Sequence, residues 1–194
     1  AGLFTKCPRP DYNLALHANS AMPAGQVGIT SGYALANVDS VDITVKGVGG
    51  HGAYPQTTKD PIVLASQIVL ALQTIVSREV AAQDSAVVTV GSIKGGTKHN
   101  IIGEEVKLQL TVRSYSDETR DKLLASIKRI SENMGRVAGL PDDKLPVVEI
   151  KDEYTPAAFN TPDLSQKAMK TMAKVIGAEN VMVSQPVMGG EDFG

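Results

Sequence analysis

The sequence predicts an α+β fold whose central unit runs β-α-β-β-α-β. Two kinds of pattern lead to this prediction. Segments 41–46, 86–94 and 106–113 alternate apolar with polar residues or are rich in valine and threonine, which favours strands. Segments 61–78 and 117–137 repeat apolar residues at helical spacing. This is the split βαβ, or ferredoxin-like, order of elements, in which both helices cover one face of the sheet.

The ends of these elements carry the expected signals. The first helix begins at Asp60-Pro61, an N-cap followed by proline at the first helical position. The second begins at Ser116, which two acidic residues follow, and it ends before Gly139 and Pro141. A short fourth strand is expected at 147–150.

Residues 1–40 and 156–194 do not belong to this unit. The first flank holds a short apolar segment, Tyr12 to His17, and the second holds a helix and a short strand. The first and last strands of a ferredoxin-like unit are antiparallel neighbours, so such a unit can be inserted into another domain. We therefore expect residues 41–155 to be an insert and the two flanks to be parts of one host domain.

The composition excludes several classes of protein. The chain has 194 residues and a formal net charge of −2, so no nucleic-acid-binding surface is expected. Its single cysteine excludes an internal disulfide and an all-cysteine metal site. The most apolar stretch, Ile62 to Val76, is broken by Ser66, Gln67 and Gln73 and is shorter than the ~20 residues of a membrane span, so no membrane partner is expected. The N-terminal residues lack a signal-peptide pattern, and because the first residue is not Met the compartment stays open.

His51 is the first candidate for chemistry. Three glycines precede it and one follows in Gly47–Pro55, which lets the backbone take tight or left-handed turns and lets a ligand approach closely. A histidine there can donate a hydrogen bond to a developing oxyanion or titrate near neutrality. The alternative is a loop histidine bonded to a carbonyl group.

Asn100 and Arg113 are candidates for substrate binding. Asn100 lies in the loop between the second and third strands and can donate to a carboxylate or carbonyl; alternatively it stabilises its own turn. Arg113 shares the free face of the sheet with Lys107, Gln109 and Thr111, and its guanidinium suits a carboxylate, although a solvated surface arginine is the common case.

His17 and Glu191 are candidates in the flanks. His17 ends the apolar segment, and a histidine at a strand end is a zinc ligand in many sites, although zinc needs three or four ligands. Glu191 and Asp192 form either a pair of functional carboxylates or an ordinary acidic loop.

Taken together, these segments resemble the metal-dependent amidohydrolases and carboxypeptidases of the aminoacylase type. Within them they are most similar to the branch with hippurate hydrolase and the indole-acetyl-amino-acid hydrolases. The resemblance follows the family's order over nearly the whole chain. It is carried by Leu14–His17, Gly49–Pro55, Asp60-Pro61, Leu72–Arg78, Asp84–Val88, Asn100–Ile102, Thr111–Arg113 and Met188–Phe193.

The resemblance implies a two-domain enzyme. A zinc-peptidase-like α/β catalytic domain would carry two divalent metal ions, expected to be zinc, and a ferredoxin-like lid inserted into it would mediate dimerisation. Residues 41–155 would be the lid, and 1–40 and 156–194 would be parts of the catalytic domain. By the resemblance, the family's Cys-x-His ligand motif and its Glu-Glu pair would lie before Ala1, and its late histidine ligand would lie beyond Gly194. The chain is therefore expected to be a fragment with an incomplete metal site.

The resemblance also implies a role for each candidate. His17 would be a metal ligand of the catalytic domain. His51 would be the lid histidine that steadies the oxyanion in the neighbouring subunit's active site. Asn100 and Arg113 would hold the substrate carboxylate, and Glu191 would lie near the active site.

The function implied for the parent protein is hydrolysis of the amide bond of N-acyl amino acids or small peptides with a metal-activated water. The expected partners are that substrate and a second copy of the chain, bound through the lid. The 194-residue piece alone is expected to be inactive, and the alternative is a non-catalytic lid and dimerisation module. His99 and Gly103 stand where the family has Phe and Pro, so the loop around Asn100 has its own shape.

Overall fold

Four strands pair into one antiparallel sheet in the order β5-β7-β3-β8. The structure is a computed structural model and describes residues 3–193. Residues 1–2 and 194, at the outer ends of the two expected flanks, lie outside the described residues. The strands are β3 (Asn37–Lys46), β5 (Ala86–Gly95), β7 (Glu105–Ser114) and β8 (Val147–Ile150). Strands β3 and β8 are antiparallel neighbours, as the sequence predicts for the first and last strands of the unit.

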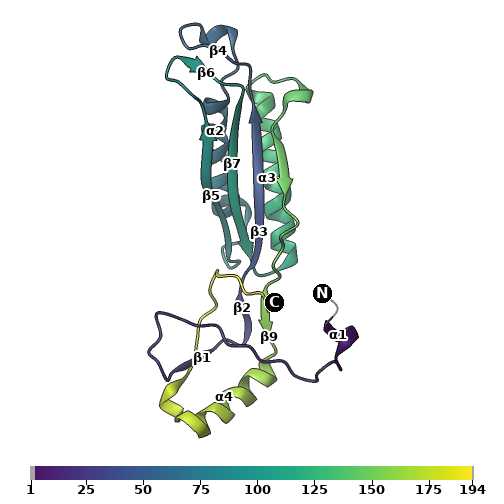
Figure 1. The fold of residues 1–194 in the computed structure, drawn as a ribbon, viewed down its shortest axis with the longest axis vertical. Helices are drawn as coiled ribbons and strands as arrows, with labels where there is room; N and C mark the ends of the chain where they lie inside the picture. The colour runs from purple at the N-terminus through teal and green to yellow at the C-terminus, as the bar shows by residue number, and fades with distance from the viewer. Residues whose placement is uncertain (1–2, 194) are drawn as a thin grey trace.

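Two long helices cover one face of this sheet (Figure 1). They are α2 (Pro61–Thr74), which a π-helical turn extends over Ile75–Glu79, and α3 (Asp117–Val137). Both predicted N-caps are confirmed, because the Asp60 carboxylate accepts from the Ile62 amide at 2.8 Å and the Ser116 hydroxyl accepts from the Thr119 amide at 3.2 Å. The order β3-α2-β5-β7-α3-β8 is the predicted alternation. We call these six elements the sheet unit.

The core of the sheet unit lies between the helices and the sheet. On β7 the burial alternates along the strand, so that the even-numbered residues are buried while Lys107 and Gln109 are exposed on the opposite face, as predicted. The fully buried apolar side chains come from both layers: Val41, Ile43, Val45, Ala65, Ile68, Leu72, Ile75, Leu108, Leu123 and Ile127.

Strand β3 begins at Asn37 rather than at Val41. It pairs with β7 along its whole length, from Asn37 opposite Ser114 to Lys46 opposite Glu105. The Asn37 side chain is buried and donates to the Ser114 hydroxyl at 2.9 Å, while its carbonyl oxygen accepts from the Ser114 amide at 2.9 Å. Strand β3 therefore begins before the alternating apolar residues, because the buried polar side chain of Asn37 has hydrogen-bond partners there.

Helix α2 and its π-helical extension together span Pro61–Glu79, and this segment is long and apolar enough to cross a membrane on length and composition alone. The expectation that the stretch is too short was wrong, because the π-helical turn lengthens it. The face formed by Leu64, Ile68 and Leu72 packs into the core, which accounts for the apolar residues on that side.

The two flanks pair with each other beyond one end of the sheet (Figure 1). Strand β1 (Val27–Ile29) runs parallel to β10 (Val181–Val183), and β2 (Gly32–Leu35) runs antiparallel to β9 (Ala158–Asn160). Helix α4 (Pro162–Ile176) joins β9 to β10. Short helices complete the described elements: α1 (Leu3–Lys6), η1 (Pro55–Thr57), η3 (Asp142–Lys144) and η4 (Ala178–Asn180). We call β1, β2, β9, β10 and α4 the paired flanks.

The segment that ends at His17 is not a strand, contrary to expectation. Tyr12, Leu14 and Leu16 are 65 %, 69 % and 84 % exposed, and none of the described strands pairs with this segment. A strand needs a neighbour for its backbone N–H and C=O groups, so this segment stays irregular.

Candidate functional site

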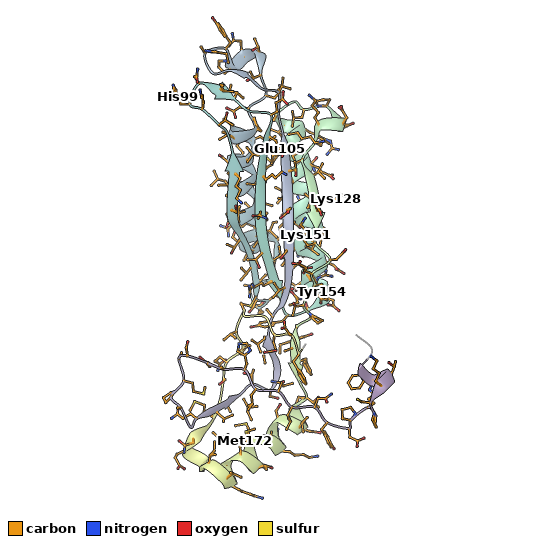
Figure 2. All side chains as sticks on the ribbon, in the orientation of Figure 1. His99, Glu105, Lys128, Lys151, Tyr154 and Met172 are labelled. Carbon is orange, nitrogen blue, oxygen red and sulfur yellow. The ribbon has the colours of Figure 1, made fainter. Side chains whose placement is uncertain are left out.

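His51 and Asn100 lie together at the end of the sheet unit that is farthest from the paired flanks (Figure 1). Here the two-residue strands β4 (Gly50–His51) and β6 (Ile101–Ile102) pair, with His51 opposite Ile101. The Gly52 amide donates to the Asn100 carbonyl at 2.9 Å. We call β4, β6 and the turns that follow β4 and precede β6 the tip; Figure 2 shows His99 on it.

The glycines around His51 permit close packing of backbones rather than left-handed turns. A Cβ on Gly49 would lie 2.9 Å from the Ile102 carbonyl oxygen, and one on Gly52 would lie 3.2 Å from the Asn100 carbonyl group. None of these glycines has a positive φ. The left-handed turns that the sequence allowed are therefore absent from this loop, and the two hairpin segments approach each other closely instead.

The His51 ring is exposed and has two neighbours from its own turn. Its Nδ1 accepts from the Ala53 amide at 3.1 Å. The Tyr54 ring lies beside it, with 5.8 Å between ring centroids and 52° between planes. Sequence reasoning did not single out Tyr54; a large aromatic residue inside a glycine-rich loop was the available signal.

His17 and Glu191 lie together near the paired flanks, although 174 positions separate them in the chain. His17 Nδ1 is 2.5 Å from Glu191 Oε2, and the Phe193 amide donates to Glu191 Oε1 at 3.2 Å. The hydrogen bond from His17, followed by that from Phe193, lowers the pKa of Glu191 below its ordinary value. The carboxylate paired with His17 is that of Glu191 and not of Asp192.

Arg113 lies at the same end of the molecule as this pair. Its Nη1 donates to the Met188 carbonyl at 2.7 Å, and its Nε donates to the Thr111 hydroxyl at 3.3 Å. Met188 belongs to the loop that carries Glu191. Two N–H groups of the guanidinium therefore donate to the protein's own atoms, a role that the sequence did not predict.

Asn100 and Arg113 lie at opposite ends of β7, which is ten residues long. A strand of that length spans about 30 Å, so within one copy these two residues cannot hold one small substrate. The tip, with His51 and Asn100, and the flank cluster, with His17, Arg113 and Glu191, are separate groups.

The flank cluster offers ligand atoms of the right chemistry for a divalent metal ion. Imidazole nitrogen and carboxylate oxygen are zinc donors, and zinc takes three or four protein ligands. His17 supplies one ligand, with Glu191 bonded to its other ring nitrogen, and residues 3–193 contain no group of three or more His, Cys, Asp and Glu side chains that could hold an ion. The donor types fit the expected metal, and further ligands are needed to complete a site.

Residues 33–137 match the family model described as the peptidase dimerisation domain. The chain belongs to the M20 peptidase dimerisation domain family. The matched residues run from within β2 through the sheet unit to the end of α3.

Relatives and solved structures agree with this assignment to the M20 family. An N-acetyldiaminopimelate deacetylase of Leuconostoc mesenteroides is 36 % identical over 195 residues, which cover 100 % of this chain and 49 % of the relative. A crystal structure of a putative aminohydrolase from methicillin-resistant Staphylococcus aureus has a TM-score of 0.77 and 33 % identity over 91 % of this chain and 44 % of its own. A Bacillus subtilis structure described as a dinuclear metal-binding M20 peptidase has a TM-score of 0.68 and 24 % identity over 91 % and 42 %, and shows the shared fold.

These relatives support the M20 family but not the narrower hippurate hydrolase branch that the sequence motifs suggested. The Leuconostoc mesenteroides relative is named for deacetylation of N-acetyldiaminopimelate, not for hydrolysis of hippurate. The chain spans about half the length of the curated relatives it matches. This coverage agrees with the expectation that the chain is a piece of a longer protein of the M20 family.

Proposed function

We propose that this chain supplies the lid, and part of the catalytic domain, of a metal-dependent amidohydrolase that cleaves N-acyl amino acids. The observation that carries the proposal is the separation of two groups with complementary chemistry. One group, at the tip, offers hydrogen-bond donors in His51 and Asn100. The other, at the flanks, offers a metal-ligand nitrogen in His17, whose ring is bonded to Glu191.

A second copy of the chain would bring the two groups together. Because about 30 Å of sheet separates them in one copy, the tip of one protomer would reach the flank cluster of its partner. The sheet unit, expected at 41–155 and beginning with β3 at Asn37, is then a ferredoxin-like lid, and the residues before and after it are the two parts of the catalytic domain that it interrupts.

The dimer contact is proposed along β5, one of the two edge strands of the sheet. An apolar groove beside this strand is lined by Val69, Leu70, Val90 and Ile93, with Ser66 at its margin. Leu70 and Ile93 are 73 % and 52 % exposed, which is unusual for apolar side chains on one continuous surface. A second copy would cover this groove while its own β5 continues the sheet.

Each residue has a defined part in the proposed reaction. Two divalent metal ions, expected to be zinc, supply the activated water when bound. His17 would hold one of them. The Nε2–H of the partner's tip histidine, His51, would donate to the carbonyl oxygen as it gains negative charge. The amide of the partner's Asn100, together with the N–H groups of Arg113 that Met188 and Thr111 leave unused, would orient the carboxylate of the amino acid.

The overall reaction adds one water across one amide bond. The acyl carbon gains the hydroxyl and leaves as a carboxylic acid, and the nitrogen gains the proton and leaves as the amine of the amino acid. The deacetylase relative favours a small acyl group such as acetyl. A substrate with a free α-carboxylate would use the proposed contacts of Asn100 and Arg113.

The test uses the full-length protein purified with divalent metal. Metal-dependent release of an amino acid from an N-acetyl amino acid is expected, together with a fall in kcat of about 100-fold or more in His51→Ala and a much smaller change in KM. Equal kcat in that variant would overturn the role of His51. A full-length protein without amidohydrolase activity in the presence of zinc, manganese or cobalt would overturn the proposal.

The second candidate is a non-catalytic lid and dimerisation module. One observation favours this candidate for the chain without the rest of its parent protein. Among residues 3–193 no three side chains of metal-binding type lie together, and the pair His17 and Glu191 is not enough to hold an ion. Metal content separates the candidates, because the enzyme should retain about two ions per chain and the module almost none.

A further inference from the structure

The turn from His51 to Tyr54 is held by hydrogen bonds on both sides. The Tyr54 amide donates to the His51 carbonyl at 2.9 Å, which closes the turn. The Tyr54 carbonyl accepts from the Thr57 amide at 3.1 Å and from the Thr57 hydroxyl at 2.8 Å. Gly52 is bonded to Asn100 across the tip. The backbone that carries His51 therefore has little freedom.

The hydrogen bond from Ala53 determines where the His51 ring carries its proton. The Ala53 amide donates to Nδ1 at 3.1 Å, and only a ring nitrogen with a free lone pair can accept. In the neutral ring the proton is then on Nε2. Among the described residues none accepts from Nε2, so this N–H is available to a ligand outside the chain.

Tyr54 is the aromatic neighbour of the same ring. Its ring lies 5.8 Å from the His51 ring, centroid to centroid, and is itself 59 % exposed. The Tyr54 backbone is held by His51 and Thr57, which fixes the point from which its side chain starts. The two rings are neighbours in the arrangement in which the Ala53 bond forms.

We propose that the Ala53 amide and the Tyr54 ring are positioning groups that make His51 a fixed Nε2–H donor projecting from the tip. The proposal rests on the proposed function for the identity of the acceptor, the acyl oxygen of a bound substrate. It adds that His51 acts as a neutral hydrogen-bond donor whose tautomer and rotamer are set before the substrate binds. Such preorganisation is what makes oxyanion contacts effective.

The tautomer is measured by ¹⁵N NMR on the chain labelled at its three histidines. His51→Gln identifies the His51 signals by their loss. We expect the pattern of a single Nε2–H tautomer for His51. His99 is the internal reference, because it has no hydrogen-bond partner among the described residues. An Nδ1–H tautomer at His51, or the same averaged pattern as His99, would overturn the proposal even in an active enzyme.

The kinetic test uses two isosteric variants of the full-length enzyme. The amide nitrogen of Gln reaches the place of histidine Nε2, whereas that of Asn reaches the place of Nδ1. We expect kcat of His51→Gln to exceed that of His51→Asn about tenfold, since the contact is with Nε2–H, with KM within a factor of two. Equal losses in both variants contradict an Nε2 donor.

Tyr54 is tested by a matched pair of variants. Tyr54→Phe keeps the ring and should keep the wild-type kcat, whereas Tyr54→Ala should lower kcat about tenfold through loss of orientation. Thermal unfolding midpoints should agree between the two variants, which separates positioning from folding. An unchanged kcat in Tyr54→Ala would remove Tyr54 from the proposal. If the full-length protein has no hydrolase activity, the proposed function fails while the NMR result still decides the tautomer.

Discussion

His17 Nδ1 donates to Glu191 Oε2 across 2.5 Å, and this contact joins the two ends of a long chain. A carboxylate only accepts, so Nδ1 of His17 carries the proton and the lone pair of the neutral ring is on Nε2. This is the arrangement in which a second carboxylate orients a metal-binding histidine. His17 and His51 thus hold opposite tautomers, one suited to binding a cation and the other to donating a hydrogen bond.

Replacing Glu191 should weaken metal binding by the full-length protein. We expect Glu191→Ala to lower metal affinity about 10- to 100-fold, because His17 loses the partner that fixes its ring, and Glu191→Gln to lie between it and the wild type. Competition with a chelator measures the affinity. Asp192→Asn is the control, since it removes a neighbouring charge without touching His17. If Glu191→Ala and Asp192→Asn bind metal equally, Glu191 does not orient the histidine.

Arg113→Ala should loosen the loop that carries Glu191. The lost bond to the Met188 carbonyl should cost about 1 kcal/mol of local stability. The Val187 amide, which donates to the Ala34 carbonyl at 3.0 Å, reports this as faster hydrogen exchange. Gln109→Ala, on the same face of the same strand, should leave that exchange rate unchanged. Equal exchange in both variants would show that the loop is held without Arg113.

Asp39→Ala should destabilise the sheet unit by about 3 kcal/mol, because it leaves Arg120 without its buried partner. The Asp39 side chain is completely buried and accepts two hydrogen bonds from Arg120, at 2.7 and 2.8 Å. Urea unfolding measures the loss. The double variant Asp39→Leu/Arg120→Met should recover much of it, since no unpaired charge remains. A double variant less stable than Asp39→Ala would contradict this account.

The Arg120 guanidinium also lies over the Tyr154 ring, 4.1 Å from its centroid. Tyr154 is at the flank end of the sheet (Figure 2). The contact therefore helps to fix residues 151–157, which connect β8 of the sheet unit to β9 of the paired flanks.

The pH dependence of stability should contain a contribution from Glu79. Hydrogen bonds from Arg129 and Ser126, at 2.7 and 2.8 Å, lower the pKa of Glu79 below its ordinary value of 4.5. A carboxyl group with a lowered folded-state pKa stabilises the protein above its ordinary pKa, and this stabilisation is lost as pH falls through the lower value. For so exposed a pair it is about 0.5 kcal/mol.

The measurement is the free energy of unfolding between pH 6 and the acid limit of stability, in ~0.5-unit steps over the titration range of carboxyl groups. Glu79→Gln should show a smaller decrease than the wild type. Glu132→Gln, on the helix α3 that carries Arg129 and Ser126 but without a partner of its own among the described residues, should follow the wild type. Identical curves for all three proteins would remove Glu79 from the acid response.

Ile93→Lys should convert the proposed dimer to monomer. Ile93 lies on the edge strand β5 and is 52 % exposed beside the apolar groove, so a buried ammonium there would be unpaired. Val147→Lys is a matched control, because Val147 is 51 % exposed on the opposite edge strand, β8. Sedimentation velocity distinguishes the outcomes. A dimer that survives Ile93→Lys but not Val147→Lys would place the contact on the other edge.

Local patterns predicted most of the sheet unit correctly. Val147–Ile150 is a strand at the predicted position, and Asp60 and Ser116 cap their helices. Apolar alternation and capping chemistry act over a few residues, so one sequence contains them fully.

The remaining differences come from contacts between distant residues. The segment before His17 has the composition of a strand but no described partner, and pairing is not a local property. The pairing of His17 with Glu191 depends on how the two flanks meet. The bond from Arg113 to Met188 has a backbone acceptor, which side-chain types cannot reveal.

Val38 and Thr155 exchange both of their backbone hydrogen bonds, at 2.9 and 3.1 Å, where the chain enters and leaves the sheet unit. In an antiparallel pair of this kind the Cα atoms lie about 5.5 Å apart, a gap that a two-residue turn closes. The geometry therefore allows the whole segment between Val38 and Thr155 to be deleted or exchanged as one piece. Joining Val38 to Thr155 through Asn-Gly would leave the flanks continuous, and a lid from another relative could be spliced in at the same two positions.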